Sequence, residues 1–118
     1  MDRRIVGNEK DVAWIPHPIA KGIEIKVLLS RKDHGAEASV MLVRAAPGAK
    51  PEVPEHVHEN SEDIIYTLKG SAKIWIEGQG EIDLIPGRVV RVPRNVKHRV
   101  SDISADFLVY DVFAPPTV

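Results

Sequence analysis

The chain has 118 residues, of which 43% are hydrophobic and 28% are charged, and its formal net charge is -1. These values predict one soluble globular domain, and the near-neutral charge argues against nucleic acid as a partner. No apolar run is long enough to span a membrane, and the absence of cysteine excludes disulfides and thiolate ligands. We therefore expect a cytoplasmic protein.

Short apolar stretches are interrupted at short intervals by Gly, Pro, Asn or Asp, which is typical of an all-β sandwich or barrel. Residues 1–21 are less regular, and we expect them to form an arm that packs on the barrel or on a partner subunit. The barrel is expected over residues 22–118. It begins with a hairpin formed by GIEIKVLLS and ASVMLVRAAPG, with a turn at RKDHGAE. The later predicted strands are DIIYTLK, SAKIWIEG, EIDLIPG, RVVRVPRN, HRVSDIS and DFLVYDVF.

Two histidines just before the strand DIIYTLK have the spacing of metal ligands. His56 and His58 lie two residues apart, so in an extended segment both side chains leave the same face and converge on one ion. A pair of this kind also occurs by chance on solvated turns. The acids Glu59, Glu62 and Asp63 follow directly, however, and a carboxylate among them can join the two imidazoles.

A third nitrogen ligand has to come from another part of the chain. His34 lies in the predicted turn and His17 lies between two prolines in the arm, so we expect both to be structural or exposed. His98 follows a turn that contains Pro93 and Asn95, and it stands near the start of a strand. Asn95 can adopt the left-handed conformation that such a turn often requires. His98 is therefore the preferred candidate.

On these residues the chain resembles a small single-domain cupin over residues 22–114. The residues that fit the two cupin motifs are His56, His58, Asp63 and Gly70 in the first, and Gly87, Pro93 and His98 in the second. The resemblance implies a cupin-type double-stranded β-helix, which is an antiparallel jelly-roll barrel. It also implies a homodimer, to which DFLVYDVF and the arm can contribute. The implied metal ligands are His56, His58, Asp63 and His98.

The sequence departs from the cupin motifs at several positions. Asp63 stands where the family has a glutamate, and Glu62 is the alternative carboxylate ligand. Strand alternation turns these two side chains to opposite faces, and the motif spacing favours Asp63. Asn95 replaces a glycine and Asp102 replaces an asparagine, which are tolerable changes in turns. The loop after Gly48 is longer than usual.

Strand alternation also predicts the walls of the site. If Asp63 points inward, Ile65 and Thr67 do so as well, and Val100 lies on the same face as His98, so the wall is mostly apolar. The facing of residues 72–77 stays open: either Lys73, Trp75 and Glu77 or the alternate residues Ala72, Ile74 and Ile76 face inward. We expect Tyr66 to pack in the core between the sheets.

Three imidazoles and one carboxylate suit one divalent transition metal, Fe, Mn, Ni, Co or Zn, and leave about two positions open on an octahedral ion. A small oxygenated molecule with two adjacent oxygens can chelate there. We therefore expect an enzyme with dioxygenase, isomerase or sugar-acid chemistry. The alternatives are a non-catalytic small-molecule binding or sensor barrel, and a barrel without a stable metal.

Overall fold

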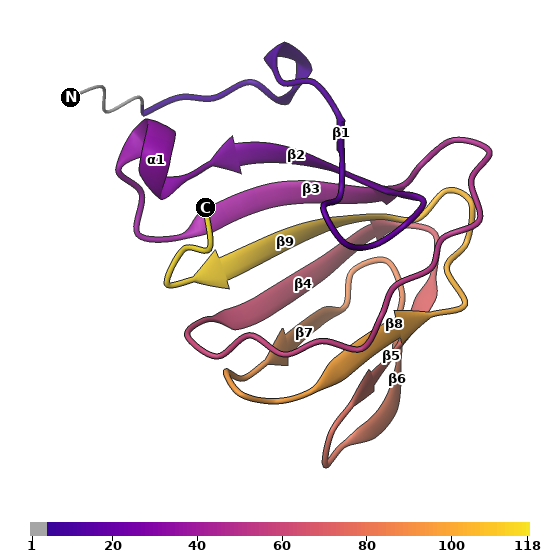
Figure 1. Ribbon diagram of the computed structural model, residues 1–118. Helices are drawn as coiled ribbons and strands as arrows, with labels where there is room; N and C mark the ends of the chain where they lie inside the picture. Colours follow the sequence, from indigo (N-terminus) through magenta and orange to yellow (C-terminus); the bar gives the residue numbers. More distant parts are fainter. Residues whose placement is uncertain (1–4) are drawn as a thin grey trace.

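The sequence folds into two antiparallel sheets, as Figure 1 shows for the computed structural model, which describes residues 5–118. The larger sheet contains, in spatial order, β1 (Ile15–Pro16), β2 (Ile23–Leu29), β3 (Ser39–Ala45), β9 (Leu108–Ala114), β4 (Glu62–Lys69) and β7 (Val89–Val92). The smaller sheet contains β6 (Gly80–Leu84), β5 (Ala72–Ile76) and β8 (His98–Ser101). The described residues also form a 3-10 turn, η1 (Glu9–Asp11), and a short helix, α1 (Arg31–His34).

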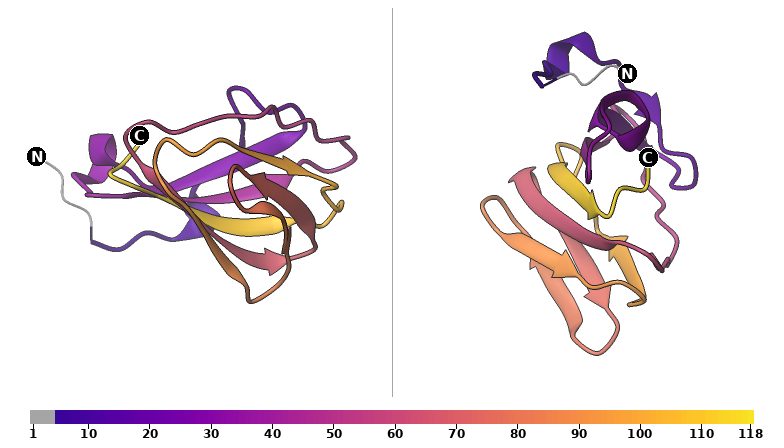
Figure 2. Two further views of the ribbon diagram at one scale, coloured as in Figure 1. Left: turned by 90° about the horizontal axis from the view of Figure 1, so that it is seen from below. Right: turned by 90° about the vertical axis from the view of Figure 1, so that its left-hand side faces the viewer.

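The predicted first hairpin is confirmed, because β2 and β3 pair in antiparallel register. Its connection is more ordered than a simple turn, since it contains the single helical turn α1. Ser30 caps this turn by accepting a hydrogen bond from the N–H of Asp33 at 3.0 Å, and Gly35 ends it in the left-handed conformation with φ 65°. The chain end returns to this place, where the N–H of Arg31 donates to the carbonyl of Val118 at 2.8 Å. Figure 2 shows this proximity from two further directions.

The hydrophobic core lies between the two sheets and settles the facing of β5. Ala72, Ile74 and Ile76 are buried, and Ile74 has no exposed surface. Complete burial of an isoleucine side chain stabilises the fold by about 1.5–3 kcal/mol. The alternate residues of β5 face away from the core, where Lys73 lies 3.5 Å from Glu81 of β6. The charged face of this strand is therefore the outer face of the smaller sheet.

The prediction that Tyr66 packs between the sheets is wrong. Strand β4 turns Asp63 and Thr67 toward the interior, so alternation turns Tyr66 to the outer face of the larger sheet. There it pairs with Tyr110 of β9 and Val89 of β7, and 41% of its surface is exposed.

The N-terminal segment crosses the outer face of the first hairpin. Strand β1 pairs with β2, and the Trp14 ring lies 4.2 Å from the guanidinium of Arg44 and 5.1 Å from the ammonium of Lys26. Lys26 also forms a 2.7 Å ion pair with Glu9. Residues 1–4 of the predicted arm lie outside the described residues. Over the part of the chain that is described, no helix is long and apolar enough to cross a membrane.

Candidate metal centre

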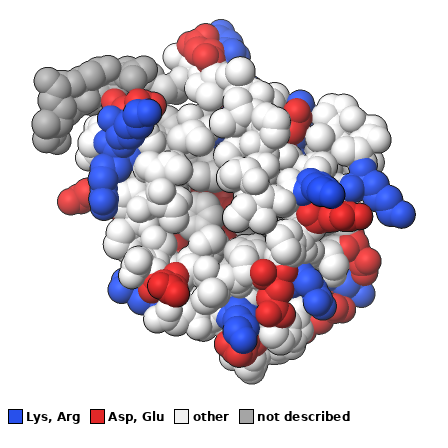
Figure 3. Space-filling model, viewed as in Figure 1, with Lys and Arg blue, Asp and Glu red and all other residues white. Residues whose placement is uncertain are grey.

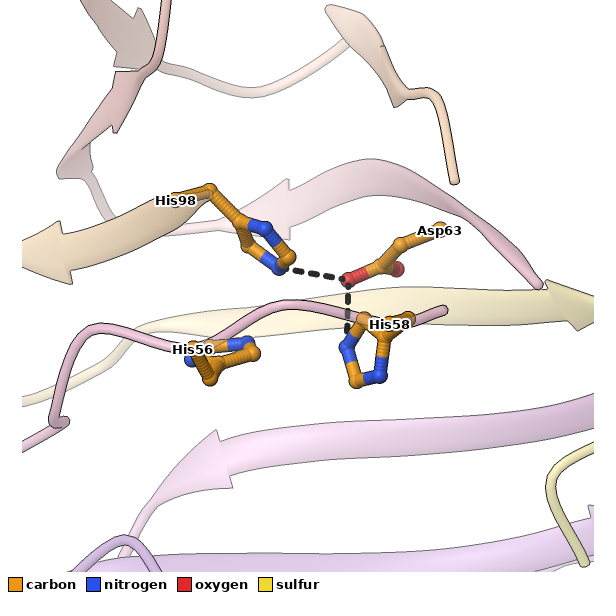
Figure 4. Close-up of side chains that lie close together, drawn as sticks. All are labelled: His56, His58, Asp63 and His98. Carbon is orange, nitrogen blue, oxygen red and sulfur yellow. Dashed lines mark ion pairs between the residues drawn. The ribbon is translucent and has the colours of Figure 1, made fainter. Parts of the chain in front are cut away.

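The structure brings together the four side chains that the sequence selects as ligands. One potential ligand atom from each of His56, His58, Asp63 and His98 lies within 4.8 Å of the other three (Figure 4). Asp63 comes from β4 and His98 from the first position of β8. The segment that carries the two other histidines is held to β8 by a pair of backbone hydrogen bonds between His56 and His98, both 2.9 Å long.

The spacing of the donor atoms leaves room for an ion. The Oδ2 atom of Asp63 lies 3.6 Å from Nε2 of His98 and 3.8 Å from Nε2 of His58. These separations are too long for hydrogen bonds. Two ligands that each lie about 2.1 Å from one ion are separated by roughly 3 to 4 Å. These two separations therefore fit a metal centre, although metal binding itself stays a prediction.

Backbone carbonyl groups fix the tautomers of two histidines. Nδ1 of His56 lies 2.9 Å from the carbonyl oxygen of Pro54, and Nδ1 of His98 lies 3.0 Å from that of Val96. Because a carbonyl only accepts hydrogen bonds, each Nδ1 carries the proton and each Nε2 keeps its lone pair for a metal. The Nε2 atoms of His58 and His98 are buried without a hydrogen-bond partner among the described residues. An ion between them would remove this deficit.

The environment favours the protonation states that metal binding requires. Burial lowers the pKa of His56 and of His58, so both imidazoles are neutral near neutral pH. Burial alone would raise the pKa of Asp63, but interactions with the neighbouring Asp111, His98 and His58 outweigh it, and the pKa lies below its usual value. Neutral imidazoles and an ionised carboxylate are the forms that bind metals.

The alternative carboxylate, Glu62, does not reach this cluster. Its Oε2 accepts a hydrogen bond from Nε of Arg91 at 2.7 Å on the outer face of the larger sheet. Asp63, by contrast, is only 3% exposed and lies between two histidines. The geometry therefore favours Asp63 as the carboxylate ligand.

A second carboxyl group, which the sequence analysis does not select, lies beside the cluster. Asp111 of β9 pairs with Ile65 of β4, one step diagonally from Asp63. Burial and the neighbouring Asp63 carboxylate raise the pKa of Asp111 well above its usual value. Asp111 is therefore the carboxyl group of this pair that holds a proton more readily. Alternation within DFLVYDVF, which places Asp111 on one face with Val109 and Phe113, was the available signal.

A cavity of about 270 Å³ opens beside the four side chains. Its apolar wall includes Ile23, Met41, Val43, Ile65, Val100 and Phe113. The inward facing predicted for Ile65 and Val100 is confirmed, and Thr67 is fully buried. Figure 3 shows charged side chains around the edge of one face of the molecule, with acidic atoms visible in a central hollow.

The two remaining histidines differ in their relation to the cavity. His34 belongs to α1, where its Nδ1 accepts a hydrogen bond from the N–H of Ser30 at 3.1 Å, which agrees with a structural role. His17 is tied to its own loop, as a structural residue would be, but it is half-buried and also lines the cavity. The sequence does not predict this position, because it depends on how the N-terminal segment folds back over the barrel.

Comparisons with known proteins agree with this fold. The family model described as "Cupin domain" matches residues 41–113, which is more than half of the chain. KdgF from Halomonas sp. is 25% identical, with 92% of this chain and 93% of that chain covered and a TM-score of 0.74. The polyketide cyclase RemF from Streptomyces resistomycificus is 26% identical, with 98% and 80% covered and a TM-score of 0.74.

Ectoine synthase from P. lautus has a TM-score of 0.80 at 19% identity, with 98% of this chain and 80% of that chain covered, a likeness that shows the fold alone. No curated protein matches the chain. The antiparallel sheets, the family match and the structural neighbours confirm the predicted jelly-roll barrel. The chain therefore belongs to the cupin family.

Proposed function

We propose that this cupin is a metal-dependent enzyme that rearranges a small oxygenated metabolite without net oxidation. The observation that carries the proposal is the convergence of three imidazoles and one carboxylate on one point at the wall of an apolar cavity. When bound there, a divalent metal would polarise a substrate carbonyl or lower the pKa of a substrate hydroxyl. The name of the 26% identical structure, a polyketide cyclase, supports chemistry of this non-oxidative class.

The cavity limits the substrate in size and in character. A volume of about 270 Å³ lies below the range of about 300–1,000 Å³ that drug-sized ligands occupy. Apart from the four proposed ligands, His17 and Asp111 are the only polar side chains among the described residues that line it. We therefore infer a small metabolite that presents two neighbouring oxygens to the centre and an apolar portion to the walls.

The residues around the cavity would have three different roles. His56, His58, Asp63 and His98 would hold the metal through atoms that the fold already aims at one point. The raised pKa of Asp111 and the lowered pKa of Asp63 leave the charge of the pair on Asp63, which would be the carboxylate ligand. The apolar walls exclude water from the bound substrate, which strengthens the electrostatic interactions at the centre.

The first test is elemental analysis of protein that has been purified without chelator or nickel resin, beside a His98→Ala variant. We expect about one metal per chain in the parent protein and little in the variant. The reconstituted protein is then screened against diols, 2-oxo acids, sugars and uronates under air and under nitrogen. Turnover that persists under nitrogen supports the proposal. Turnover that needs air would replace it with dioxygenase chemistry, and a parent protein without metal after reconstitution would overturn it.

The small number of polar side chains in the cavity favours one alternative, a barrel that binds a metabolite without converting it. In that case the metal anchors the ligand. A small molecule that survives purification and is recovered unchanged from the metal-loaded protein would support this alternative over the enzyme.

The homodimer that the cupin resemblance implies remains a proposal. The outer face of the larger sheet carries Tyr66, Tyr110 and Val89, which are 41%, 39% and 61% exposed. A second barrel packed on this face would cover them. Sedimentation equilibrium at the monomer mass over the working concentration range would contradict the dimer.

A further inference from the structure

His17 occupies a loop that fixes both the orientation and the tautomer of its ring. The residue directly follows β1, and its N–H donates to the carbonyl of Ile23 at 2.9 Å. Its Nδ1 accepts two backbone hydrogen bonds, from Ile19 at 3.0 Å and from Ala20 at 2.9 Å. An atom that accepts hydrogen bonds carries no proton. The neutral ring therefore carries its proton on Nε2, the nitrogen on the other side of the ring from the loop hydrogen bonds.

This N–H group differs from those of two other imidazoles that line the cavity. His56 and His98 use their Nδ1 protons on backbone carbonyl groups, so these two rings offer no N–H group to a ligand. Within residues 5–118, Nε2 of His17 has no hydrogen-bond partner, and His17 is one of the residues that line the cavity. Burial and the nearby His56 lower the pKa of His17, which keeps the ring a neutral donor. Polar cavity groups of this kind commonly orient a ligand.

We propose that His17 is a substrate-binding residue, and that its Nε2–H group donates a hydrogen bond to an oxygen of the molecule that is chelated at the metal centre. This inference rests on the proposed function, because it needs a ligand at the open metal positions. It adds a substrate class: a chelating oxo or hydroxy acid, whose carboxylate or carbonyl oxygen accepts the hydrogen bond while its apolar portion contacts the walls. The N-terminal segment thereby supplies part of the site, outside both cupin motifs.

The two nitrogen atoms of His17 can be tested separately. In His17→Asn the amide oxygen stands near the position of Nδ1, so the variant keeps an acceptor for the loop and loses the donor. In His17→Gln the longer side chain brings an amide N–H group near the position of Nε2, so the variant keeps a donor and loses the acceptor. The probe is oxalate, titrated into the Co(II)-loaded protein and followed by the visible absorption of the cobalt. Ethylenediamine, which chelates but offers no oxygen acceptor, is the matched control ligand.

We expect His17→Asn to weaken oxalate binding about ten- to hundredfold, which is typical for the loss of one hydrogen bond to a charged group. Its affinity for ethylenediamine, its cobalt content and its melting temperature should stay close to those of the parent. His17→Gln should recover part of the oxalate affinity even though it loosens the loop. A loop that merely shapes the cavity would give the opposite order, with Gln the weaker variant and both chelators affected alike.

The outcomes separate this inference from the proposed function. If the parent binds cobalt and oxalate and His17→Asn binds oxalate equally well, the role of His17 is refuted while the metal centre stands. Equal weakening of oxalate and ethylenediamine refutes it as well. A parent protein that binds no cobalt refutes the proposed function and, with it, this inference.

Discussion

Replacement of Asp63 by asparagine tests the choice of carboxylate ligand. The variant keeps the volume of a side chain that is only 3% exposed and removes the charge that lies 3.6 Å and 3.8 Å from two imidazole nitrogens. Changes at groups that merely support a ligand lower metal affinity by about 10- to 100-fold. We expect the loss of the ligand charge to cost at least about 100-fold. Glu62→Gln is the matched control, because the Glu62 carboxylate lies on the outer face with Arg91.

The expected effect can be expressed as a thermal shift. At a free metal concentration of about 100 times the dissociation constant, binding stabilises the folded state by about 2.7 kcal/mol. A chain of 118 residues has an unfolding entropy of about 0.25 kcal/mol per kelvin, so the parent protein should gain about 11 °C. After a 100-fold loss of affinity the gain falls to about 2 °C at the same metal concentration.

The assay is differential scanning calorimetry of each variant with and without the metal, so that effects on the metal-free protein cancel. Glu62→Gln should keep the full shift of about 11 °C. A full shift in Asp63→Asn, or its loss in Glu62→Gln, would refute the assignment of Asp63.

Three further predictions concern pH, backbone strain and buried polarity. Burial lowers the pKa of His56 and His58 from 6.5, so the folded state binds fewer protons than the unfolded chain, and the metal-free protein should lose stability as the pH falls below 6.5. The double variant His56→Gln/His58→Gln should show a shallower loss in urea unfolding between about pH 7.5 and pH 5.5. Gly70→Ala should lower the free energy of unfolding by about 2–5 kcal/mol, since φ is 70° and the added Cβ would lie 2.8 Å from backbone before β9. Thr67→Val should leave stability unchanged or raise it, because the Thr67 hydroxyl is buried without a described hydrogen-bond partner.

Each of these predictions has a contrary result. If stability falls with pH equally steeply in the double histidine variant, the pH dependence must come from other titratable groups, such as His17 and Asp111, which both proteins contain. Gly78→Ala is the control for Gly70, since φ is 83° there but nothing lies within 4 Å of the added Cβ. Equal losses in the two alanine variants would show that close packing at Gly70 costs nothing. A loss of more than about 1 kcal/mol in Thr67→Val would indicate a hydrogen bond that the structure does not show.

The sequence predicts the four clustered side chains well because the information about them is local. His56 and His58 converge through the two-residue period of an extended segment, and Asp63 follows in the same stretch. The turn before His98 is also encoded locally, since Asn95 adopts the left-handed conformation that was expected, with φ 64°. The two-residue period of an extended segment and the residues of the turn were therefore enough to identify side chains that come together in space.

The surroundings of the cluster could not be predicted in the same way, because they depend on pairings between distant segments. Asp111 lies beside Asp63 only because β9 inserts between β3 and β4. This order of strands cannot be derived from local sequence patterns. His17 reaches the cavity only because the N-terminal segment folds back along β2. The prediction that Tyr66 packs in the core was wrong, because the face opposite to that of Asp63 is the outer face of the larger sheet and not a second core.

The paired hydrogen bonds between His56 and His98 have a consequence for how substrates are selected. The segment that they hold in place supplies two proposed ligands and, through Val53, Pro54 and Val57, part of the cavity wall. If this wall moved aside to admit a bulky molecule, the two histidines would move with it, and a bound metal would lose two of its proposed ligands. A bound metal would therefore oppose widening of the cavity on that side and so limit the size of the substrate. The loop of His17 and Ile19, which also lines the cavity, is joined to the same segment by the hydrogen bond from the N–H of Glu52 to the carbonyl of Lys21 at 2.9 Å.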